Sequence, residues 1–274
     1  MKYPRLLSIA GSDSGGGAGI QADLKTFAAL GCYGMTAITA LTAQNTLRVR
    51  SIHPVPEEML RDQIDAVVED IGVDAVKIGM LHSAVIVRTV AAAIDRHGLR
   101  HVVLDPVMMS TSGARLIDNE AQAVLVADLF HRASVITPNL DEAALLVGHP
   151  LASEADMEAA AIQLLAMGAR AVLLKGGHLA GDTVSDLLRV RDGAQRWMRA
   201  PRIRTGNTHG TGCTLSSAVA AHLALGAPLV QAVELARAFV RSALEAGALV
   251  RTGAGSGPLN HGFAPERMRL QPLH

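Results

Sequence analysis

Short apolar runs alternate with segments of helical period along almost the whole chain. The apolar runs have the length of buried β-strands and are separated by amphipathic stretches. They are Leu6–Ala10, Met35–Leu41, Ala75–Ile78, Val102–Leu104, Val135–Ile136 and Ala171–Leu174. Such alternation predicts an α/β fold with a mostly parallel sheet. A β-hairpin is expected near the end, with strands over Val184–Val190 and Gln195–Met198 around Asp192-Gly193.

The intervening segments predict helices, several of which carry recognisable start and stop signals. Gly31 and Gly98 are placed to end helices, Pro56 to lie in a first turn, and Ser153 with Asp156 to form a capping pattern. The expected helices are Ile20–Ala28, Pro56–Ile71, Ser83–His97, Asp118–Phe130, one from about Leu140, one after Ser153, Thr214–Leu225 and Pro228–Leu249. No internal repeat, low-complexity tract or linker demands a second unit, so we expect a single domain over residues 1–274.

The amino-acid composition argues against several classes of function. Lys plus Arg and Asp plus Glu each number 25, and only 3% of residues are aromatic. This balance argues against a nucleic-acid partner, which would leave a basic surface or a stacking platform. The cysteines are Cys32 and Cys213, too few for a disulfide framework. No segment has the apolar length to span a membrane, and a soluble cytoplasmic protein is expected.

Polar residues gather where the predicted strands end. In an open α/β sheet, ligands bind outside the carboxyl ends of the strands. Five strands place unusual residues there, namely Gly11-Ser12-Asp13, Gly79-Met80, Asp105-Pro106, Thr137-Pro138-Asn139 and Lys175-Gly176-Gly177. Packing requires apolar residues and does not by itself produce this distribution, so a binding site is predicted at this rim.

Each of these polar residues also has an ordinary structural explanation. Asp105 could cap a helix, Asn139 could occupy a helix N-cap, and Lys175 could be a solvated strand end. Taken together with Glu142, one turn after Asn139, they indicate a site for nucleotide phosphates and magnesium.

The stretch from Asn207 to Ala218 reads as a loop of small residues that runs into an apolar helix beginning near Gly212. Glycines allow close backbone approach and the helix start presents unpaired N–H groups, so Gly210, Thr211 and Gly212 could bind a phosphate. The same location is expected to lower the pKa of Cys213. The ordinary alternative is a tight turn with a threonine cap and a buried cysteine.

Two familiar phosphate motifs are not matched. No Gly-x-x-x-x-Gly-Lys-Ser/Thr sequence occurs, which excludes a P-loop enzyme. The glycines from Gly15 to Gly19 follow a strand but lack the dinucleotide-binding spacing, because Ile20 occupies the last position. An oxidoreductase of the dinucleotide-binding type is therefore disfavoured.

The chain closely resembles the hydroxymethylpyrimidine/phosphomethylpyrimidine kinases of the ribokinase superfamily, over nearly its whole length and in order. The segments that carry the resemblance are Ala10–Thr26, Ala43–Thr46, Lys77–Met80, Asp105–Met108, Thr137–Ala143, Lys175–His178, Asn207–Cys213 and Gly257–His261. The resemblance implies ATP-dependent phosphorylation of 4-amino-5-hydroxymethyl-2-methylpyrimidine, and then of its monophosphate, in thiamine biosynthesis. It also implies a ribokinase-like sheet flanked by helices, a homodimer, and ATP with Mg²⁺, while a requirement for a monovalent cation stays open.

The resemblance also assigns roles to individual residues. The pyrimidine would be bound by Gln44, Asp23 and the backbone near Val107, with Gly11, Ala18 and Met80 lining its pocket. Gln44 offers an acceptor and two donors, which suits an aminopyrimidine edge. The nucleotide would be bound by Lys175, Thr137, Asn139 and Thr211, and Mg²⁺ by Asn139, Glu142 and Asp105. Gly210, Gly212, Cys213 and Asp105 would form the catalytic set.

Cys213 departs from the wider superfamily, whose sugar kinases carry Asp at this position as the general base. A thiolate could act in that way, or Cys213 could only position the hydroxymethyl group. Related pyridoxal kinases also have Cys here, so phosphorylation of pyridoxal or pyridoxine is the alternative enzymatic function. A sensor that binds the pyrimidine without catalysis is a third hypothesis, disfavoured because a sensor has no need of Asp105, Lys175 and Cys213 together.

Overall fold

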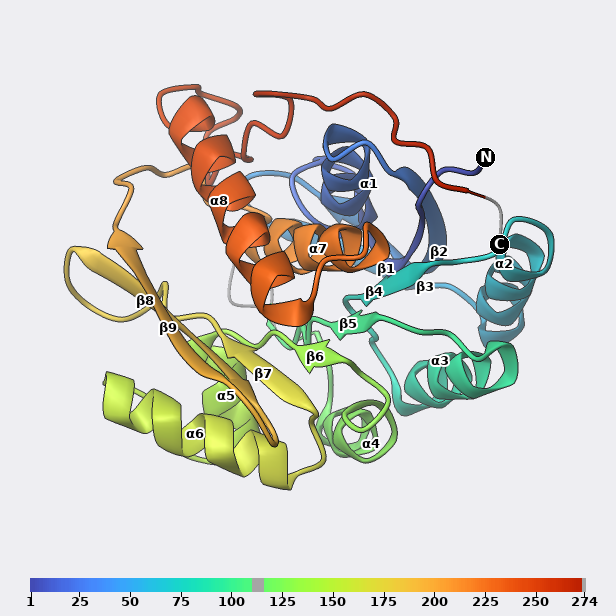
Figure 1. Ribbon diagram of the computed structural model, residues 1–274, viewed down its shortest axis with the longest axis horizontal. Helices are drawn as coiled ribbons and strands as arrows, with labels where there is room; N and C mark the ends of the chain where they lie inside the picture. The colour runs from blue at the N-terminus through green and yellow to red at the C-terminus, as the bar shows by residue number, and fades with distance from the viewer. Residues whose placement is uncertain (110–115, 273–274) are drawn as a thin grey trace.

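The computed structural model describes residues 1–109 and 116–272, which form a central sheet covered by helices (Figure 1). The sheet has the strand order β3-β2-β1-β4-β5-β6-β7-β8-β9. Its strands are β1 (Arg5–Asp13), β2 (Tyr33–Gln44), β3 (Val49–Pro54), β4 (Ala75–Ile78), β5 (Val102–Leu104), β6 (Val135–Ile136), β7 (Ala171–Leu174), β8 (Thr183–Val190) and β9 (Gln195–Pro201).

Parallel pairing holds the centre of the sheet together, from β2 through β1, β4, β5 and β6 to β7. The outer strands β3, β8 and β9 pair antiparallel. All of the parallel strands therefore point their carboxyl ends toward one edge, as the strand-end residues predicted. The register of β1 against β2 shifts between Ala10 and Ser12, so β1 is irregular at Gly11, where it reaches that edge.

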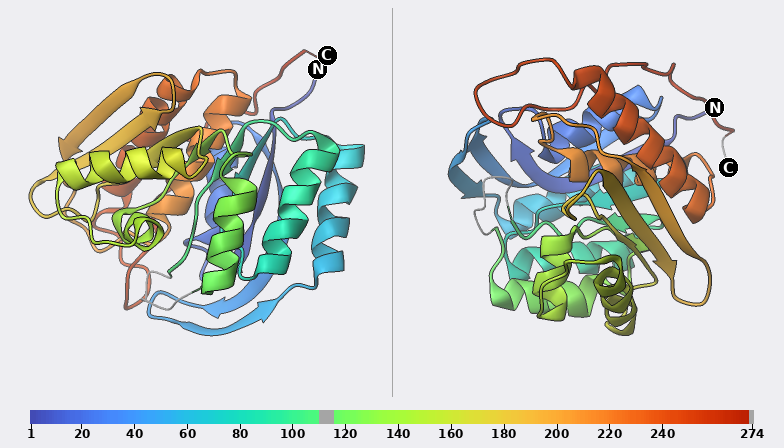
Figure 2. Two further views of the ribbon diagram at one scale, coloured as in Figure 1. Left: turned by 90° about the horizontal axis from the view of Figure 1, so that it is seen from below. Right: turned by 90° about the vertical axis from the view of Figure 1, so that its left-hand side faces the viewer.

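Helices cover both faces of the sheet, as the two views of Figure 2 show. One face carries α1 (Gly19–Ala29), α7 (Thr211–Ala224) and α8 (Leu229–Gly247), and the other carries α2 (Glu57–Asp70), α3 (Ala84–His97), α4 (Asn119–Leu129), α5 (Leu140–Val147) and α6 (Glu154–Ala166). Successive strand residues face opposite layers, so Leu6 packs under α1 and α7 while Leu7 packs toward α2 and α3. The predicted α/β class with helices on both faces is confirmed.

Local sequence signals place most helix ends correctly. Ser83 caps α3, Asp118 caps α4, and Ser153 with Asp156 forms a capping box on α6. Gly98 adopts the left-handed conformation at the end of α3. The strand β3 was not predicted, because five of its six residues are exposed and no alternation of apolar and polar residues marks it.

No helix in the described parts of the chain has the length and apolar character needed to cross a membrane.

Candidate active site

A cavity of about 700 Å³ opens at the carboxyl ends of the central strands and at the start of α7. It brings together residues that the sequence placed at the ends of separate strands. Of the predicted site residues, those in its wall are Gly11, Ala18, Gln44, Met80, Asp105, Val107, Asn139, Glu142, Lys175, Gly210, Thr211, Gly212 and Cys213. Two of the predicted residues, Asp23 and Thr137, lie behind this wall.

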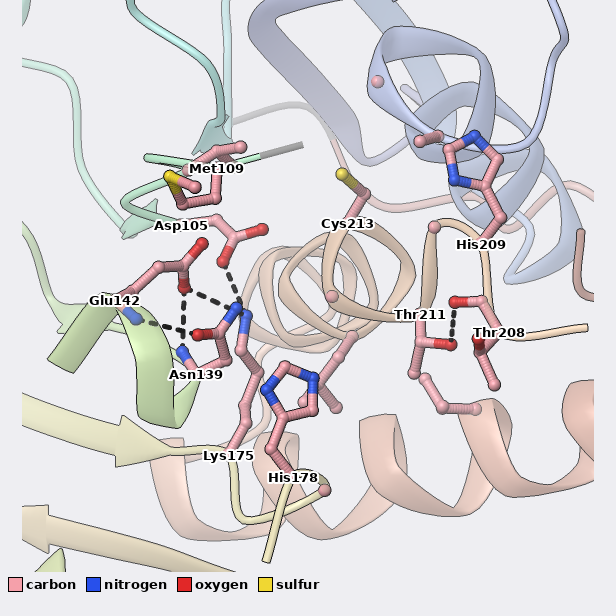
Figure 3. Close-up of a pocket in the computed structure, with 18 of the residues that line it drawn as sticks. Asp105, Met109, Asn139, Glu142, Lys175, His178, Thr208, His209, Thr211 and Cys213 are labelled. Carbon is pink, nitrogen blue, oxygen red and sulfur yellow. Dashed lines mark hydrogen bonds and ion pairs between the residues drawn. The ribbon is translucent and has the colours of Figure 1, made fainter. Parts of the chain in front are cut away.

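An ammonium group between two carboxylates occupies one end of the cavity (Figure 3). The Nζ atom of Lys175 lies 2.8 Å from Oδ1 of Asp105 and 4.0 Å from Oε2 of Glu142. Burial favours the neutral acid for Asp105, yet the charges of Lys175 and Lys77 hold its pKa below the usual range. For Glu142 burial dominates and raises the pKa to about 7, despite the opposing charge of Lys175.

Asn139 is the N-cap of α5, which confirms the ordinary explanation of this residue. Its Oδ1 accepts a hydrogen bond from the Glu142 N–H at 2.9 Å, and Oε2 of Glu142 accepts one from the Asn139 N–H at 2.8 Å. This capping box holds the Glu142 carboxylate at the cavity wall. The cap and a place beside a bound metal are therefore compatible, because the box orients a carboxylate toward the cavity.

The oxygen donors at this end fit a magnesium ion that arrives with a nucleotide. Mg²⁺ in such sites takes one or two carboxylates and completes its shell with phosphate oxygens and water. Asp105 and Glu142 supply two carboxylates in the wall. Among the described residues there is no group of three or more His, Cys, Asp or Glu side chains that could hold a metal by itself. The donor set therefore suits a shared site rather than a cage made by protein alone.

The start of α7 faces the same end of the cavity. The helix begins at Thr211, one residue before the expected position, and Gly210 precedes it with a φ of 84°. A Cβ atom on Gly210 would lie 1.8 Å from the Gly17 carbonyl oxygen, so a side chain is excluded there. The N–H groups of Gly212 and Cys213 belong to the first turn, where no intrahelical acceptor exists. Such free N–H groups are the kind that bind anions at helix starts, and Gly212 lies next to Lys175.

The prediction of a lowered pKa for Cys213 was wrong. Burial raises the pKa of this thiol to about 11, even though the nearby charge of Lys77 and the Gly19 amide act in the opposite direction. Low-polarity surroundings penalise the thiolate more than the helix start stabilises it. Cys213 lines the cavity and is half-buried, and its thiol is neutral near pH 7.

The expected contact between Asp23 and a substrate does not match the position of this side chain. Asp23 is fully buried and accepts hydrogen bonds from Ser8 at 2.5 Å, Ser217 at 2.7 Å and the Lys77 ammonium at 3.0 Å. These partners use the carboxylate inside the layer between β1, β4, α1 and α7. Asp23 therefore supports the cavity from behind, by neutralising the buried charge of Lys77.

Thr137 also acts from behind the wall. Its hydroxyl donates to Oδ1 of Asp105 at 3.1 Å and shares a hydrogen bond of 2.9 Å with Ser216 on α7. The residue is fully buried, and no direct nucleotide contact is possible without movement. Its place indicates that it orients Asp105, the residue whose carboxylate also meets Lys175.

Polar groups of the other end of the cavity converge on Gln44. The Gln44 Nε2 atom lies 3.4 Å from Nε2 of His209, which lies 2.8 Å from Oδ2 of Asp13. Thr42 donates to Oε1 of Gln44 at 3.2 Å. The same Asp13 carboxylate receives N–H groups from the glycine-rich loop between β1 and α1. Asp13 and His209 thus join the two glycine loops beside the residue expected to bind the pyrimidine.

An apolar extension of the cavity was not predicted. It is built from β8, β9, α8 and the residues that follow β9, and its lining includes Val184, Ala200, Pro201, Ile203, Val240 and Leu244. The arginines Arg202, Arg237 and Arg241 lie along the same part. Apolar residues on a hairpin and a helix resemble ordinary core positions, so the sequence carried no signal for this lobe.

Comparison with known proteins identifies the family. The sequence profile described as phosphomethylpyrimidine kinase matches residues 13–260. The chain belongs to this family. It is 51% identical over 256 residues to hydroxymethylpyrimidine/phosphomethylpyrimidine kinase from Rhizobium meliloti, a match that covers 93% of this chain and 96% of that protein. This phosphomethylpyrimidine kinase family member is therefore similar to such an enzyme along nearly its entire length.

Solved structures agree with this assignment and show the ribokinase-like fold. The crystal structure of phosphomethylpyrimidine kinase from Clostridium difficile matches with a TM-score of 0.78 and 41% identity, over 88% of this chain and 99% of that one. An ADP complex of Bacillus subtilis pyridoxal kinase matches with a TM-score of 0.86 and 37% identity, over 95% of this chain and 98% of that one. Fold alone does not separate the two kinases, whereas the sequence relatives favour the pyrimidine kinase.

Proposed function

We propose that this protein phosphorylates 4-amino-5-hydroxymethyl-2-methylpyrimidine with ATP, and then converts the monophosphate to the diphosphate. Membership of the phosphomethylpyrimidine kinase family carries the proposal. The cavity supports it, because Gln44 lies toward one end and the charged cluster with the start of α7 toward the other. A flat substrate between these ends would direct its hydroxymethyl oxygen toward the phosphoryl group.

The charged end and the apolar lobe together suit a nucleotide. Phosphates would meet Lys175 and the N–H groups at the start of α7, while Asp105 and Glu142 would hold Mg²⁺. A bound Mg²⁺ would neutralise phosphate charge during transfer. The base would occupy the lobe between β9 and α8, whose apolar walls match a nucleobase face. The ADP complex of Bacillus subtilis pyridoxal kinase, a protein of the same fold, supports the proposal that this chain binds a nucleotide.

The transfer would break the bond between the γ-phosphorus and its bridging oxygen, releasing ADP, and form a bond to the substrate oxygen, whose proton would pass to an oxygen of the transferred phosphate. Because the Cys213 thiol is neutral near pH 7, we propose that it holds and orients the substrate oxygen and does not act as a thiolate general base. Lys175 and the α7 amides would stabilise the transferred group by preorganised positive charge. We further propose that the protein is a cytoplasmic homodimer. Kinase assays at increasing concentrations of a monovalent cation would test whether such a cation is required.

The deciding experiment incubates purified protein with Mg-ATP and either the hydroxymethylpyrimidine or pyridoxal. Conversion of the pyrimidine through the monophosphate to the diphosphate, with little pyridoxal phosphate, is the expected result. Efficient phosphorylation of pyridoxal that stops at one phosphate would move the chain to the alternative that the pyridoxal kinase structure represents. Omission of Mg²⁺ should abolish both steps.

Replacement of Cys213 by alanine tests the chemistry within this function. We expect turnover to fall by about 10²-fold or more, the range associated with a positioned catalytic group, while pyrimidine affinity is largely retained. Affinity is measured by calorimetry without nucleotide. Turnover equal to that of the unmodified protein would remove Cys213 from the mechanism.

A further inference from the structure

The C-terminal segment of residues 253–261 lies outside the chemistry described above, yet it contacts both loops that build the site. It follows α8 and passes between the Gln44–Thr46 loop and the loop from Gly206 to His209. The left view of Figure 2 shows this part of the chain near the end of the β2–β3 ribbon. Its backbone pairs with the Gly206–His209 loop, since the His209 N–H donates to the Gly257 carbonyl at 3.0 Å.

Three glycines of the segment make contacts too close for any side chain. A Cβ atom on Gly255 would lie 2.0 Å from the Thr46 carbonyl oxygen, and a Cβ atom on Gly253 would lie 2.4 Å from the Thr46 hydroxyl oxygen. A Cβ atom on Gly257 would lie 2.1 Å from Oδ1 of Asn207. The backbone of the segment therefore fits directly against Thr46 on one side and Asn207 on the other, and the distance between these loops depends on it.

Ser256 joins the two loops by hydrogen bonds. Its N–H donates to the Thr46 carbonyl at 3.1 Å, and its hydroxyl donates to the Gly206 carbonyl at 3.0 Å. The hydroxyl also lies 3.3 Å from that of Thr208. Thr46 is two residues from Gln44, and Thr208 is next to His209. Ser256 is half-buried and is not in the described wall of the cavity, so its side chain acts through its partners.

We propose that residues 253–261, through Ser256, set the distance between the Gln44–Thr46 loop, which would bind the pyrimidine, and the Gly206–His209 loop, which leads into the start of α7 where the phosphoryl group would be transferred. The inference rests on the proposed function and assigns Ser256 as a positioning residue for it. Phosphoryl transfer requires the substrate oxygen close to and in line with the phosphorus, and a displacement near 1 Å costs about 10²-fold in rate. A contact that fixes both loops to one residue meets this requirement.

Two substitutions alter the contact in different ways. Ser256→Ala removes the hydroxyl bonds to the Gly206–His209 loop but keeps the N–H bond to Thr46, whereas Gly255→Ala forces a methyl group against the Thr46 carbonyl. We expect kcat/KM for the hydroxymethylpyrimidine to fall about 10-fold in the first and about 10²-fold in the second. KM for Mg-ATP should stay within about twofold, because the ion pairs and hydrogen bonds that hold Lys175, Asp105 and Glu142 do not involve residues 253–261.

The matched controls are Gly193→Ala and Ser256→Thr. Gly193 lies in the β8–β9 turn, where an added Cβ would meet Val190 at 3.6 Å, an ordinary contact, so its kinetics should be unchanged. Ser256→Thr keeps the hydroxyl and should recover most of the activity. Thr46→Val removes the hydroxyl that accepts the Gly255 N–H at 3.2 Å, and it tests the contact from the opposite loop if a variant of the segment fails to fold.

The decisive measurement compares pyrimidine and Mg-ATP kinetics together with the ratio of ATP hydrolysed to pyrimidine phosphorylated. A selective loss of pyrimidine kcat/KM, with more ATP hydrolysed per product, supports the positioning role. Equal loss for both substrates in proportion to lost folded protein, or unchanged kinetics in Ser256→Ala and Thr46→Val, overturns it. Unmodified protein that does not phosphorylate the pyrimidine overturns the proposed function instead.

Discussion

At the scale of single residues, burial controls the chemistry of this site more strongly than position in the sequence does. Cys213 lies in the first turn of a helix, a location that ordinarily favours a thiolate. Low-polarity surroundings reverse that preference and raise its pKa to about 11. The pattern of residues could predict that Cys213 lies at the site, but the balance between helix and burial depends on neighbours such as Lys77 and Asp23 that only the fold brings close.

This ionisation state predicts slow alkylation of Cys213 at neutral pH. With a pKa of about 11, roughly one thiol in ten thousand is ionised at pH 7, far fewer than for a free cysteine. The rate of reaction with iodoacetamide should therefore keep rising with pH to about 11. Mass spectrometry of the modified peptide measures it, and Cys213→Ala protein gives the background from Cys32, whose pKa burial raises to about 12. A rate that levels off below pH 8 would contradict this prediction.

At the scale of elements, the helix α5 combines a cap with a functional position. Asn139 was predicted both as a possible N-cap and as a metal ligand. The sequence could not separate these two roles, because an asparagine before a helix is a common N-cap whether or not it also lies beside a metal. The structure shows a capping box with Glu142. The helix α6 carries an equivalent box of Ser153 and Asp156, neither of which is among the residues that line the cavity. This pair of helices allows the structural and functional contributions to be separated by experiment.

Replacement of either cap by alanine should cost a similar amount of stability. We expect Asn139→Ala and Ser153→Ala each to lower the free energy of unfolding by about 1 kcal/mol, because each leaves an N–H at the start of a helix without its acceptor. Urea denaturation without nucleotide measures this loss. Only Asn139→Ala should also lower kinase activity, since it releases the Glu142 carboxylate at the cavity. Equal activity in the two variants would show that Asn139 acts only as the N-cap of α5 and has no role in the kinase reaction.

How well each helix or strand could be predicted from the sequence depends on how strong its local sequence pattern is. Strands β4, β5, β6 and β7 were predicted with their observed bounds, because their residues are buried on both faces and read as continuous apolar runs. The edge strand β3 has no such run, and its pairing with β2 depends on the neighbour. The apolar lobe of the cavity was missed for a related reason, since its residues look like core positions until β9 and α8 are placed together.

At the scale of the whole molecule, the C-terminal residues join the two helices α7 and α8 that lie on one face of the sheet. His261 shares a hydrogen bond of 2.9 Å with Thr214 on α7, and the Asn260 N–H donates to Ala243 on α8. The sequence marked residues 257–261 only through the family resemblance. No periodicity marks these residues, because they lie outside the helices and strands. Their placement makes stability depend on the ionisation of one buried imidazole.

Burial of His261 lowers its pKa to about 4 from an ordinary value of 6.5, and the charge of Lys25 acts in the same direction. Between these two values the unfolded chain binds more protons than the folded protein. The stabilising contribution is therefore complete above about pH 6.5 and is lost as the pH falls toward 4, by up to about 3 kcal/mol.

Urea denaturation of wild-type protein and of His261→Gln at several pH values between 7 and 4.5 tests this dependence. Glutamine can still hydrogen-bond to Thr214 but does not titrate, so carboxylates and the other histidines contribute equally to both proteins. The difference in unfolding free energy should change in favour of the variant as the pH falls. Parallel stability curves over this range would show that His261 is not protonated on unfolding, and the link between the C-terminal residues and acid stability would then fail.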